Sequence, residues 1–390
     1  MNPLRVIFRS DASVHIGIGH VMRCLTLAEA LRERGAKCQF ICREYEGHLL
    51  EQIRQRGFHA YGLPVADKLA DPTRSDAKQN SGQFVRLGLD WTTDAAQTKV
   101  SAARTVIDWL IVDHYALDAQ WERALRPICR RLMVIDDLAD RRHDCDVLLD
   151  QNFHRDQDQR YQELLPKQCK TLLGPAYVLL RSEFEKARQR LRMRDGIVKR
   201  LLVFFGGSDP KNQTQTVLTL LEKMNIPDVL IDVVVGHTNP NRRAIQEFCD
   251  RLPSVTYHCN VSNMAELIVN ADLGIGAGGS AMWERCYLGL PTITVVFAEN
   301  QVRTSEDVAQ LGAIEYLGST DSLGADDYER AISRLIANPQ RLKQISDAAL
   351  AVVQKQTTSS VVDEILNFQQ QDSAIYPAHS TNHTFPALSN

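Results

Sequence analysis

The feature that most constrains this chain is an alternation of short apolar runs with longer stretches of helical spacing. The runs at Leu4–Phe8 and Leu132–Ile135 are short and β-rich, whereas residues 22–34 and 119–130 carry apolar side chains at helical intervals. Parallel sheets covered by helices on both faces have this pattern. The first half is therefore predicted to be a parallel α/β domain.

The same pattern starts again in the second half, where an apolar run at Leu201–Phe205 leads into paired glycines and a helix at residues 213–223. A length of 390 residues also suggests two domains of ordinary size. The fold class predicted is α/β, with two Rossmann-like, doubly wound domains facing each other across a cleft.

Composition shifts suggest where these domains begin and end. We expect an N-terminal domain at residues 1–180, a charged linker helix at 181–196 and a C-terminal domain at 197–368. The polar, proline-containing segment 369–390 has no periodicity, and such segments bury too little apolar surface to order themselves, so a disordered tail is expected.

Charge and composition exclude several classes of partner and compartment. The net charge is −3 with both signs interspersed, which argues against binding to nucleic acid or to an anionic membrane. No apolar run approaches the ~18 residues that span a bilayer, and the first residues lack a signal-peptide core. The nine cysteines are an odd number and form no C-x-x-C pair. A cytoplasmic protein without a metal or cofactor is expected.

The segment Ser10–Arg23 is the first candidate site. Gly17 and Gly19 stand directly before His20, between the first strand and the first helix. This is where α/β sheets bind ligands, and the helix dipole favours a neutral imidazole that can accept a proton. Asp11, at the end of the strand, is positioned to orient the imidazole or contact a sugar. The alternative is a structural histidine near the start of a helix.

A second glycine-rich turn, Gly276–Ser280, lies between a strand and a helix of the C-terminal half. Free N–H groups at such a helix start can hold a diphosphate, and Glu284 lies four residues on, within reach of a ribose. The alternative for Glu284 is a solvated helix residue. The amides of Asn300 and its neighbours end the next strand, and the turn at Gly207 repeats the first motif more weakly.

Polar residues also end two strands of the first half. Tyr115 belongs to the sequence Asp113-His114-Tyr115, whose side chains are expected to face the same cleft as His20. Asp136 and Asp137 end the next strand, and whether they are functional or cap a turn stays open.

Several long motifs resemble one family. They are R-S-D-x-S-x-x-I-G-x-G-H-x-x-R-C-x-x-L-A from Arg9, I-V-D-H-Y from Ile111, C-D-V-L-L-D-Q-N from Cys145, L-G-P-x-Y-x-L-L-R-x-E-F from Leu173, G-G-S-D and E-N-Q. In this order they resemble the UDP-2,4-diacetamido-2,4,6-trideoxy-β-L-altropyranose hydrolases of pseudaminic acid biosynthesis. The resemblance covers residues 4 to 365 and leaves out the tail.

This resemblance implies a fold like that of the two-domain (GT-B) nucleotide-sugar glycosyltransferases. It also implies hydrolysis of the UDP-sugar to UDP and free sugar with inversion, in a pathway that serves flagellin glycosylation. The family's catalytic histidine matches His20 and its nearby tyrosine matches Tyr115. Its UDP and sugar contacts correspond to Arg181, Gly207, Ser280, Glu284 and Asn300. One departure is the glycine-rich sequence at 276–280, where some members carry serines.

The chemistry of the residues agrees with this implication. UDP is a good leaving group whose charge helix N-termini can stabilise, so one base and an anion-binding turn suffice without a metal. The alternatives are a glycosyltransferase using a UDP-sugar donor, a sugar epimerase, and a nucleotide-sugar-binding regulator without turnover. The oligomeric state stays open, with a monomer compatible, and so does the stereochemistry of the sugar.

Overall fold

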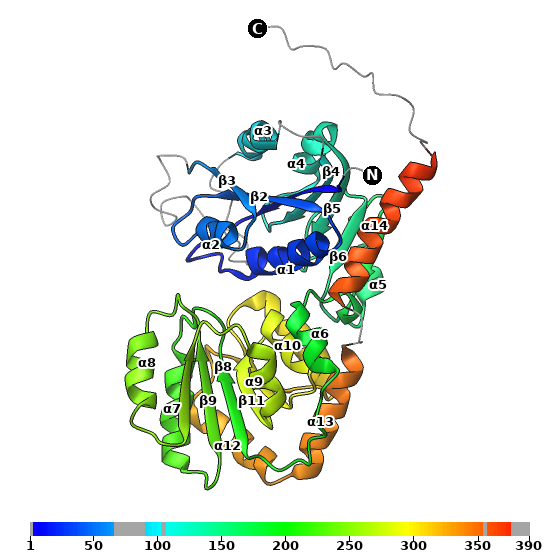
Figure 1. Cartoon of the computed structure of the whole chain (residues 1–390). Coiled ribbons are helices and arrows are strands. Elements are labelled where there is room, and N and C mark those ends of the chain that lie inside the picture. Colours follow the sequence, from blue (N-terminus) through cyan, green and yellow to red (C-terminus); the bar gives the residue numbers. More distant parts are fainter. Residues whose placement is uncertain (1–2, 66–89, 103–106, 354–356, 376–390) are drawn as a thin grey trace.

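The computed structural model describes residues 3–65, 90–102, 107–353 and 357–375. It consists of two parallel sheets, each covered by helices on both faces, one above the other in Figure 1. The predicted fold class is therefore confirmed. None of the helices in this part of the chain has the length and apolar character needed to cross a bilayer.

The first sheet has seven strands in the order β3-β2-β1-β4-β5-β6-β7, and every pair is parallel. Val6 and Phe8 of β1 pack on one face while Ile7 between them packs on the other, as expected for a strand buried on both sides. The strands are β1 (Arg5–Ser10), β2 (Lys37–Arg43), β3 (His59–Leu63), β4 (Ile107–Asp113), β5 (Cys129–Ile135), β6 (Val147–Asp150) and β7 (Lys170–Leu173).

Helices cover both faces of this sheet. The helices of the first part of the chain are α1 (Gly19–Glu33), α2 (Leu50–Gln55), α3 (Trp91–Ala102), α4 (Ala119–Leu125) and α5 (Gln157–Arg160), with short 3₁₀ turns at Arg126–Ile128 and Pro175–Tyr177. Helices α1 and α2 pack on one face, and α3 and α4 on the other.

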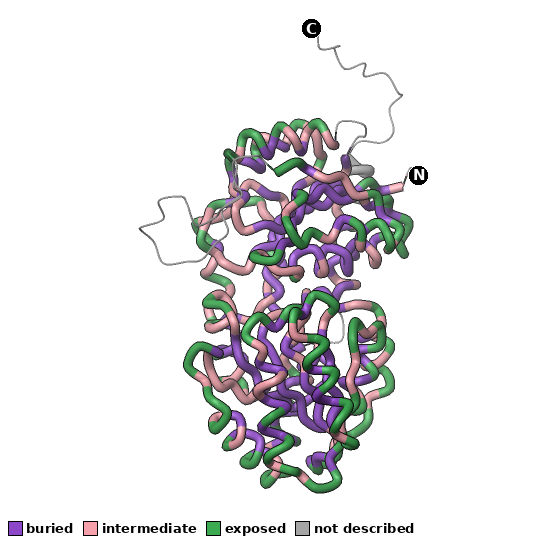
Figure 2. The backbone as a smooth tube through the Cα atoms, turned by 90° about the vertical axis from the view of Figure 1, so that its left-hand side faces the viewer, coloured by how far each residue is buried: buried purple, intermediate pink, exposed green. Residues whose placement is uncertain are grey.

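The second sheet has six parallel strands in the order β10-β9-β8-β11-β12-β13. These strands are β8 (Arg200–Phe204), β9 (Leu230–Val235), β10 (Val255–Cys259), β11 (Leu273–Ala277), β12 (Thr292–Val296) and β13 (Glu315–Ser319). Its helices are α7 (Gln213–Met224), α8 (Arg242–Cys249), α9 (Met264–Asn270), α10 (Ser280–Tyr287), α11 (Val302–Gln310), α12 (Ala325–Ile336) and α13 (Pro339–Val352), with a 3₁₀ turn at Glu299–Gln301. Each domain has its own buried interior (Figure 2).

The connection between the domains is less helical than expected. Helix α6 runs from Ser182 to Arg188, and the charged residues that follow are not helical. Their side chains cap other helices: Arg192 donates to carbonyls at the end of α9, and Arg194 donates to Leu288 and Gly289 just after α10. These bonds satisfy carbonyl groups at the helix ends, which explains why the chain leaves the helical path.

Helix α14 (Thr358–Ile375) crosses back to the first domain (Figure 1). Val361, Val362 and Ile365 are buried in the same core as α1, and the Phe368 ring lies edge-on to Trp109 at 5.7 Å. The C-terminal domain was expected to end at residue 368 with a disordered tail from residue 369, whereas α14 continues to Ile375. We propose instead that α14 be counted with the first domain, because its apolar face is buried there. Residues 376–390 of the expected tail lie outside the described residues.

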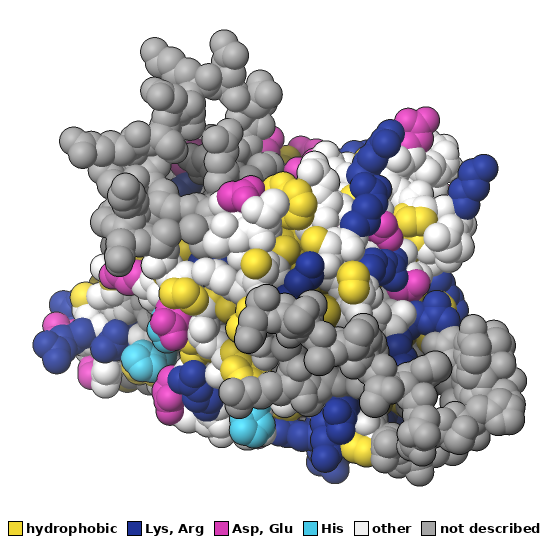
Figure 3. Space-filling view, turned by 90° about the horizontal axis from the view of Figure 1, so that it is seen from above, with side chains coloured by type: hydrophobic (Ala, Val, Ile, Leu, Met, Phe, Trp, Pro, Cys, Tyr) yellow, Lys and Arg dark blue, Asp and Glu magenta, His cyan; other side chains and the backbone are white. Residues whose placement is uncertain are grey.

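Both charge signs are present on the face of the first domain seen from above. In Figure 3, Lys and Arg side chains alternate with Asp and Glu and with scattered hydrophobic groups. On this face, the described residues therefore form no continuous field of one sign.

Candidate active site

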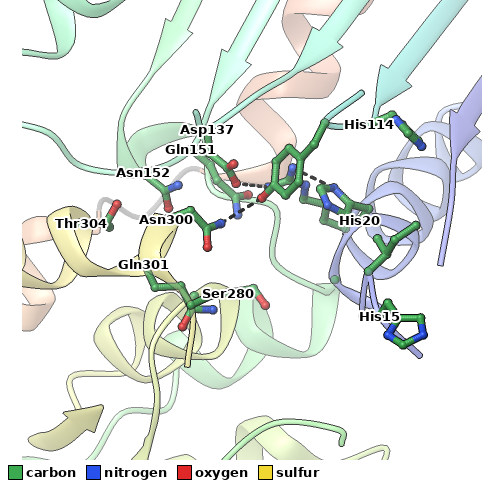
Figure 4. Close-up of a pocket in the computed structure, with 17 residues that line it drawn as sticks. His15, His20, His114, Asp137, Gln151, Asn152, Ser280, Asn300, Gln301 and Thr304 are labelled. Atoms are coloured by element: carbon green, nitrogen blue, oxygen red, sulfur yellow. Dashed lines mark hydrogen bonds and ion pairs between the residues drawn. The ribbon is translucent and has the colours of Figure 1, made fainter. Parts of the chain in front are cut away.

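A cavity of about 370 Å³ lies between the two domains. The first domain contributes the β1–α1 loop and the residues that follow β4, β5 and β6. The second contributes the start of α10, the 3₁₀ turn at 299–301 and Thr304 of α11. Of the predicted site residues, those lining the cavity are Gly17, Gly19, His20, Tyr115, Ser280 and Asn300 (Figure 4). These six residues come from both domains, as predicted for a cleft between them.

The β1–α1 loop is shaped by local hydrogen bonds and by one glycine. The Gly17 N–H donates to the Ser13 carbonyl at 2.9 Å, and the Ser13 hydroxyl accepts from the Ile16 N–H at 2.9 Å. Gly17 has φ 80°, a conformation that L side chains rarely adopt, so a glycine is required there. The loop leads directly into α1 and brings His20 to the cavity.

His20 is held by a carboxylate of the neighbouring strand. Its Nδ1 lies 2.6 Å from Asp113 Oδ1, and the imidazole is largely buried. Because an ionised carboxylate only accepts hydrogen bonds, Nδ1 carries a proton, and in the neutral imidazole Nε2 is then the unprotonated nitrogen. Nε2 is therefore the nitrogen able to accept a proton from a group in the cavity.

Arg23, one helical turn after His20, fixes this carboxylate. Its Nε and Nη2 donate to the two oxygens of Asp113 at 2.6 and 2.7 Å, and its Nη1 donates to Asp137 at 3.0 Å. Burial opposes ionisation of Asp113, but the charge of Arg23 and the hydrogen bonds from Arg23 and His20 outweigh it and lower the pKa of Asp113. Asp113 is thus a charged, immobile acceptor for His20.

Tyr115 joins the two domains across the cavity. Its ring lies edge-on to His20 with the centroids 4.4 Å apart, and its hydroxyl accepts a hydrogen bond from Asn300 Nδ2 at 3.1 Å. Burial raises the pKa of Tyr115, and the charge and hydrogen bond of Asp137 raise it further. The phenol is therefore protonated at neutral pH.

The N-terminus of α10 faces the cavity from the second domain. Gly279 has φ 71° and precedes Ser280, which lines the cavity and begins a helix without a side-chain cap. A Cβ on Gly276 would come within 2.1 Å of the Phe204 carbonyl, so the strand before the turn also requires glycine. This turn presents backbone N–H groups and the positive end of a helix dipole, as an anion site needs.

Asp11 does not have the role expected for it. It is 1% exposed, lies outside the cavity lining and accepts from Arg9, from the Arg43 backbone N–H at 2.6 Å and from His114 at 3.1 Å. Asp11 forms a buried ion pair with Arg9 in the interior of the first domain. Asp113, on the adjacent strand, orients His20 instead.

Arg181, Glu284 and Gly207 do not line the cavity, but Glu284 lies one helical turn after Ser280, which does. Arg181 Nη2 lies 3.4 Å from Glu284 Oε1, and burial raises the pKa of Glu284 despite this pairing. Gly207 lies against the β1–α1 loop, where a Cβ would come within 3.0 Å of Ile18. The three predicted contacts are thus adjacent to the site, and whether they bind a nucleotide stays a prediction.

The two aspartates after β5 differ in their surroundings. Asp136 is fully buried, pairs with Arg141 at 2.8 Å and accepts from the Ala139 N–H at 2.9 Å, as a structural residue does. Asp137 lines the cavity and contacts Arg23. Of this pair only Asp137 lines the cavity, where it contacts Arg23 and Tyr115, and whether it takes part in a reaction stays open.

Sequence reasoning did not single out several polar residues of the cavity. They are Arg23, Gln151, Asn152 and Thr304, whereas Gln301 belongs to the amides expected after β12. Their positions after β6 and near the end of β12 were a usable signal, since ligands bind at the carboxyl ends of parallel strands. Among the described residues, no three His, Cys, Asp or Glu side chains are grouped as metal ligands would be.

Sequence comparison finds distant relatives. The chain is 26% identical over 313 residues to the uncharacterized protein MJ1062 of Methanocaldococcus jannaschii, spanning 78% of this chain but only 58% of that protein. It is 25% identical over 317 residues to the UDP-2,4-diacetamido-2,4,6-trideoxy-beta-L-altropyranose hydrolase of Campylobacter jejuni, spanning 80% of this chain and 99% of the hydrolase. The resemblance that the motifs indicated is confirmed.

Structure comparison finds the same architecture in glycosyltransferases. MurG of Acinetobacter baumannii aligns with a TM-score of 0.61 at 14% identity, covering 94% of this chain and 100% of MurG. Anabaena Alr3699/HepE, solved in complex with UDP and glucose, aligns with a TM-score of 0.53 at 12% identity, covering 94% and 99%. These likenesses concern the fold.

Residues 201–365 match the glycosyltransferase family 28 C-terminal domain, which coincides with the second sheet and its helices. The domain match and the relatives together support an enzyme that acts on nucleotide sugars. The chain has a GT-B-like fold, its residues 201–365 match the glycosyltransferase family 28 C-terminal domain, and over most of its length it is similar to a UDP-sugar hydrolase.

Proposed function

We propose that this protein hydrolyses UDP-2,4-diacetamido-2,4,6-trideoxy-β-L-altropyranose to UDP and the free sugar, in pseudaminic acid biosynthesis. The observation that carries the proposal is the 2.6 Å contact of His20 with Asp113, in the same cavity as the start of α10. A base with its proton-accepting nitrogen free and an anion site on the opposite wall are what this hydrolysis needs.

In the proposed reaction, His20 Nε2 accepts a proton from a water molecule as the water oxygen attacks the anomeric carbon. The bond from that carbon to the diphosphate oxygen breaks, and UDP leaves with the electron pair. The N–H groups at the start of α10 stabilise the negative charge, and Tyr115 holds the water or the sugar. Attack opposite the leaving group inverts the configuration.

The substitution His20→Asn tests the base. General-base catalysis contributes about 10²- to 10⁴-fold, so UDP release by the variant is expected to fall by that factor while UDP binding persists. His59→Asn, an exposed histidine on β3, is the matched control and is expected to keep wild-type activity. A folded His20→Asn protein with near-normal turnover would contradict the assignment.

A glycosyltransferase that uses a UDP-sugar donor is the alternative, and the family 28 domain favours it. The two functions differ in what receives the sugar. Release of UDP and inverted free sugar in buffer alone, followed by NMR, supports hydrolysis. Release that begins only when a sugar acceptor is added supports transfer.

A further inference from the structure

Two amides of the cavity are each bound by a residue of the opposite domain. Asn152, which follows β6 of the first domain, accepts a hydrogen bond at its Oδ1 from the indole N–H of Trp283 in α10, at 2.9 Å. Asn300 of the second domain donates through Nδ2 to the Tyr115 hydroxyl at 3.1 Å. Figure 4 shows both amides in the cavity wall.

The chemistry of these partners fixes which end of each amide remains for a ligand. An indole N–H only donates, so Asn152 must turn its carbonyl toward Trp283, and its NH₂ group is left. Tyr115 has one hydroxyl proton and hydrogen-bonds with the Asp137 carboxylate, which only accepts. Asn300 must therefore donate to Tyr115, and its carbonyl is left.

The neighbouring side-chain amide, Gln151, is oriented in the same way as that of Asn152. The Gln151 Oε1 accepts from the Leu179 backbone N–H at 3.1 Å, which leaves its NH₂ group as the free end. Gln151 is largely buried and lines the cavity. The cavity thus offers N–H donors from residues 151 and 152 and a carbonyl acceptor from Asn300.

We propose that Asn152 and Asn300 determine specificity for an acylamino substituent on the sugar, with Trp283 and Tyr115 as positioning residues. An acylamino group has a carbonyl that accepts and an N–H that donates, and it carries no charge. A hydroxyl donates and accepts through a single oxygen, whereas the acylamino group presents its donor and its acceptor on separate atoms, and a carboxylate would be repelled by Asp137. The inference rests on the proposed UDP-sugar site but not on whether water or another acceptor receives the sugar.

The orientation of the Asn152 and Asn300 amides depends on contact between the two domains. Both hydrogen bonds cross from one domain to the other, so each amide is oriented only in the arrangement seen in this structure. If the domains separate, each amide can turn by half a rotation at little cost and offer the opposite end. We therefore expect recognition of the acylamino group to accompany closure of the cleft.

Asn152→Asp tests the proposal because the carboxylate still accepts from Trp283 but has no N–H to offer. The probes are the UDP-diacetamido sugar and two analogues that carry a hydroxyl in place of one acetamido group, at C2 or at C4. Wild type is expected to prefer the diacetamido compound over one analogue by at least about tenfold, in equilibrium binding and in UDP release. The variant is expected to lose this preference to within about threefold.

Two further variants complete the test. Trp283→Phe removes the donor that orients Asn152 and is expected to reduce the preference in the same way. The affinity for UDP alone is measured beside it, because Trp283 is buried in α10. Asn338→Asp makes the same chemical change at an exposed helix N-cap, where aspartate is also favourable, and is expected to leave the preference intact.

The outcomes separate this inference from the proposed function. Retention of the wild-type preference by folded Asn152→Asp, or a wild type that binds all three probes equally, overturns the inference even if UDP is released. A preference in binding that the variant loses, without UDP release in buffer, supports the inference and contradicts hydrolysis.

Discussion

At the scale of single residues, the site depends on one carboxylate that cannot move. Arg23 holds both oxygens of Asp113, and His20 binds to one of them. A carboxylate fixed in this way sets both the tautomer and the orientation of the imidazole. Asp113 does not itself line the cavity, so it acts on the reaction through His20.

Asp113→Asn tests this positioning role. An asparagine can turn its NH₂ group toward His20, which stabilises the wrong tautomer, so kcat is expected to fall about 100-fold or more with little change in UDP affinity. UDP release and UDP binding are measured for the variant and for Asp108→Asn. Asp108 lies at the other end of β4 and is expected to tolerate the change. A kcat within about threefold of wild type would exclude the role.

A second residue gives the protein a predictable pH dependence. Burial, together with the charge of Asp137, raises the pKa of Asp150 to about 7. Between about pH 4 and pH 7 the folded state binds a proton that the unfolded state has released, so the unfolding free energy falls as pH rises through this window.

Asp150→Asn removes this titration. Relative to wild type, the variant is expected to gain roughly 2–4 kcal/mol in unfolding free energy between about pH 4 and pH 7. Denaturant unfolding across this range measures the difference. Asp158→Asn, an exposed residue of α5, is the control and is expected to give none, because solvent hydrates its charge. A flat difference for Asp150→Asn would show that its carboxyl ionises normally in the folded protein.

At the scale of elements, helices α10 and α14 show two ways in which distant parts of the chain fix a helix. The N-terminus of α10 faces the cavity, and the carbonyls that follow its last turn are bound by Arg194 at 2.9 Å. Helix α14 is held by its apolar face, which packs with α1. Because α1 carries His20 near its start, α14 supports the helix that holds this histidine in the cavity.

Ile365→Ala tests the contribution of α14. Ile365 is fully buried against the first domain, and truncation of a buried isoleucine costs about 2–5 kcal/mol of stability. Asp363 lies on the same helix as Ile365 and forms an exposed ion pair with Arg34, at the end of α1. Asp363→Ala is expected to cost less than about 1 kcal/mol. Equal stabilities of the two variants in denaturant unfolding would argue against the packing of α14 on the first domain.

At the scale of the whole molecule, polar contacts join the two domains around the cavity. Besides the two amides, Arg303 pairs with Asp156 at 2.7 Å, and the Arg155 N–H donates to Asp307 at 3.4 Å. Polar contacts of this kind are weaker than an apolar interface, so relative motion of the domains is the default expectation. A cleft that opens and closes would admit a nucleotide sugar and then exclude water from all but the reacting position.

The two-domain α/β architecture, the β1–α1 loop before His20 and the glycine turn before α10 could all be predicted from the sequence. These features are local: strand and helix periodicity and glycines at forced turns are visible within a few neighbouring residues. Only the tertiary structure decided that Asp113 rather than Asp11 binds His20, that Asn152 faces Trp283 and that α14 returns to the first domain. Those contacts join residues 93 and 131 positions apart, or opposite ends of the chain, and their geometry depends on how sheets and domains pack.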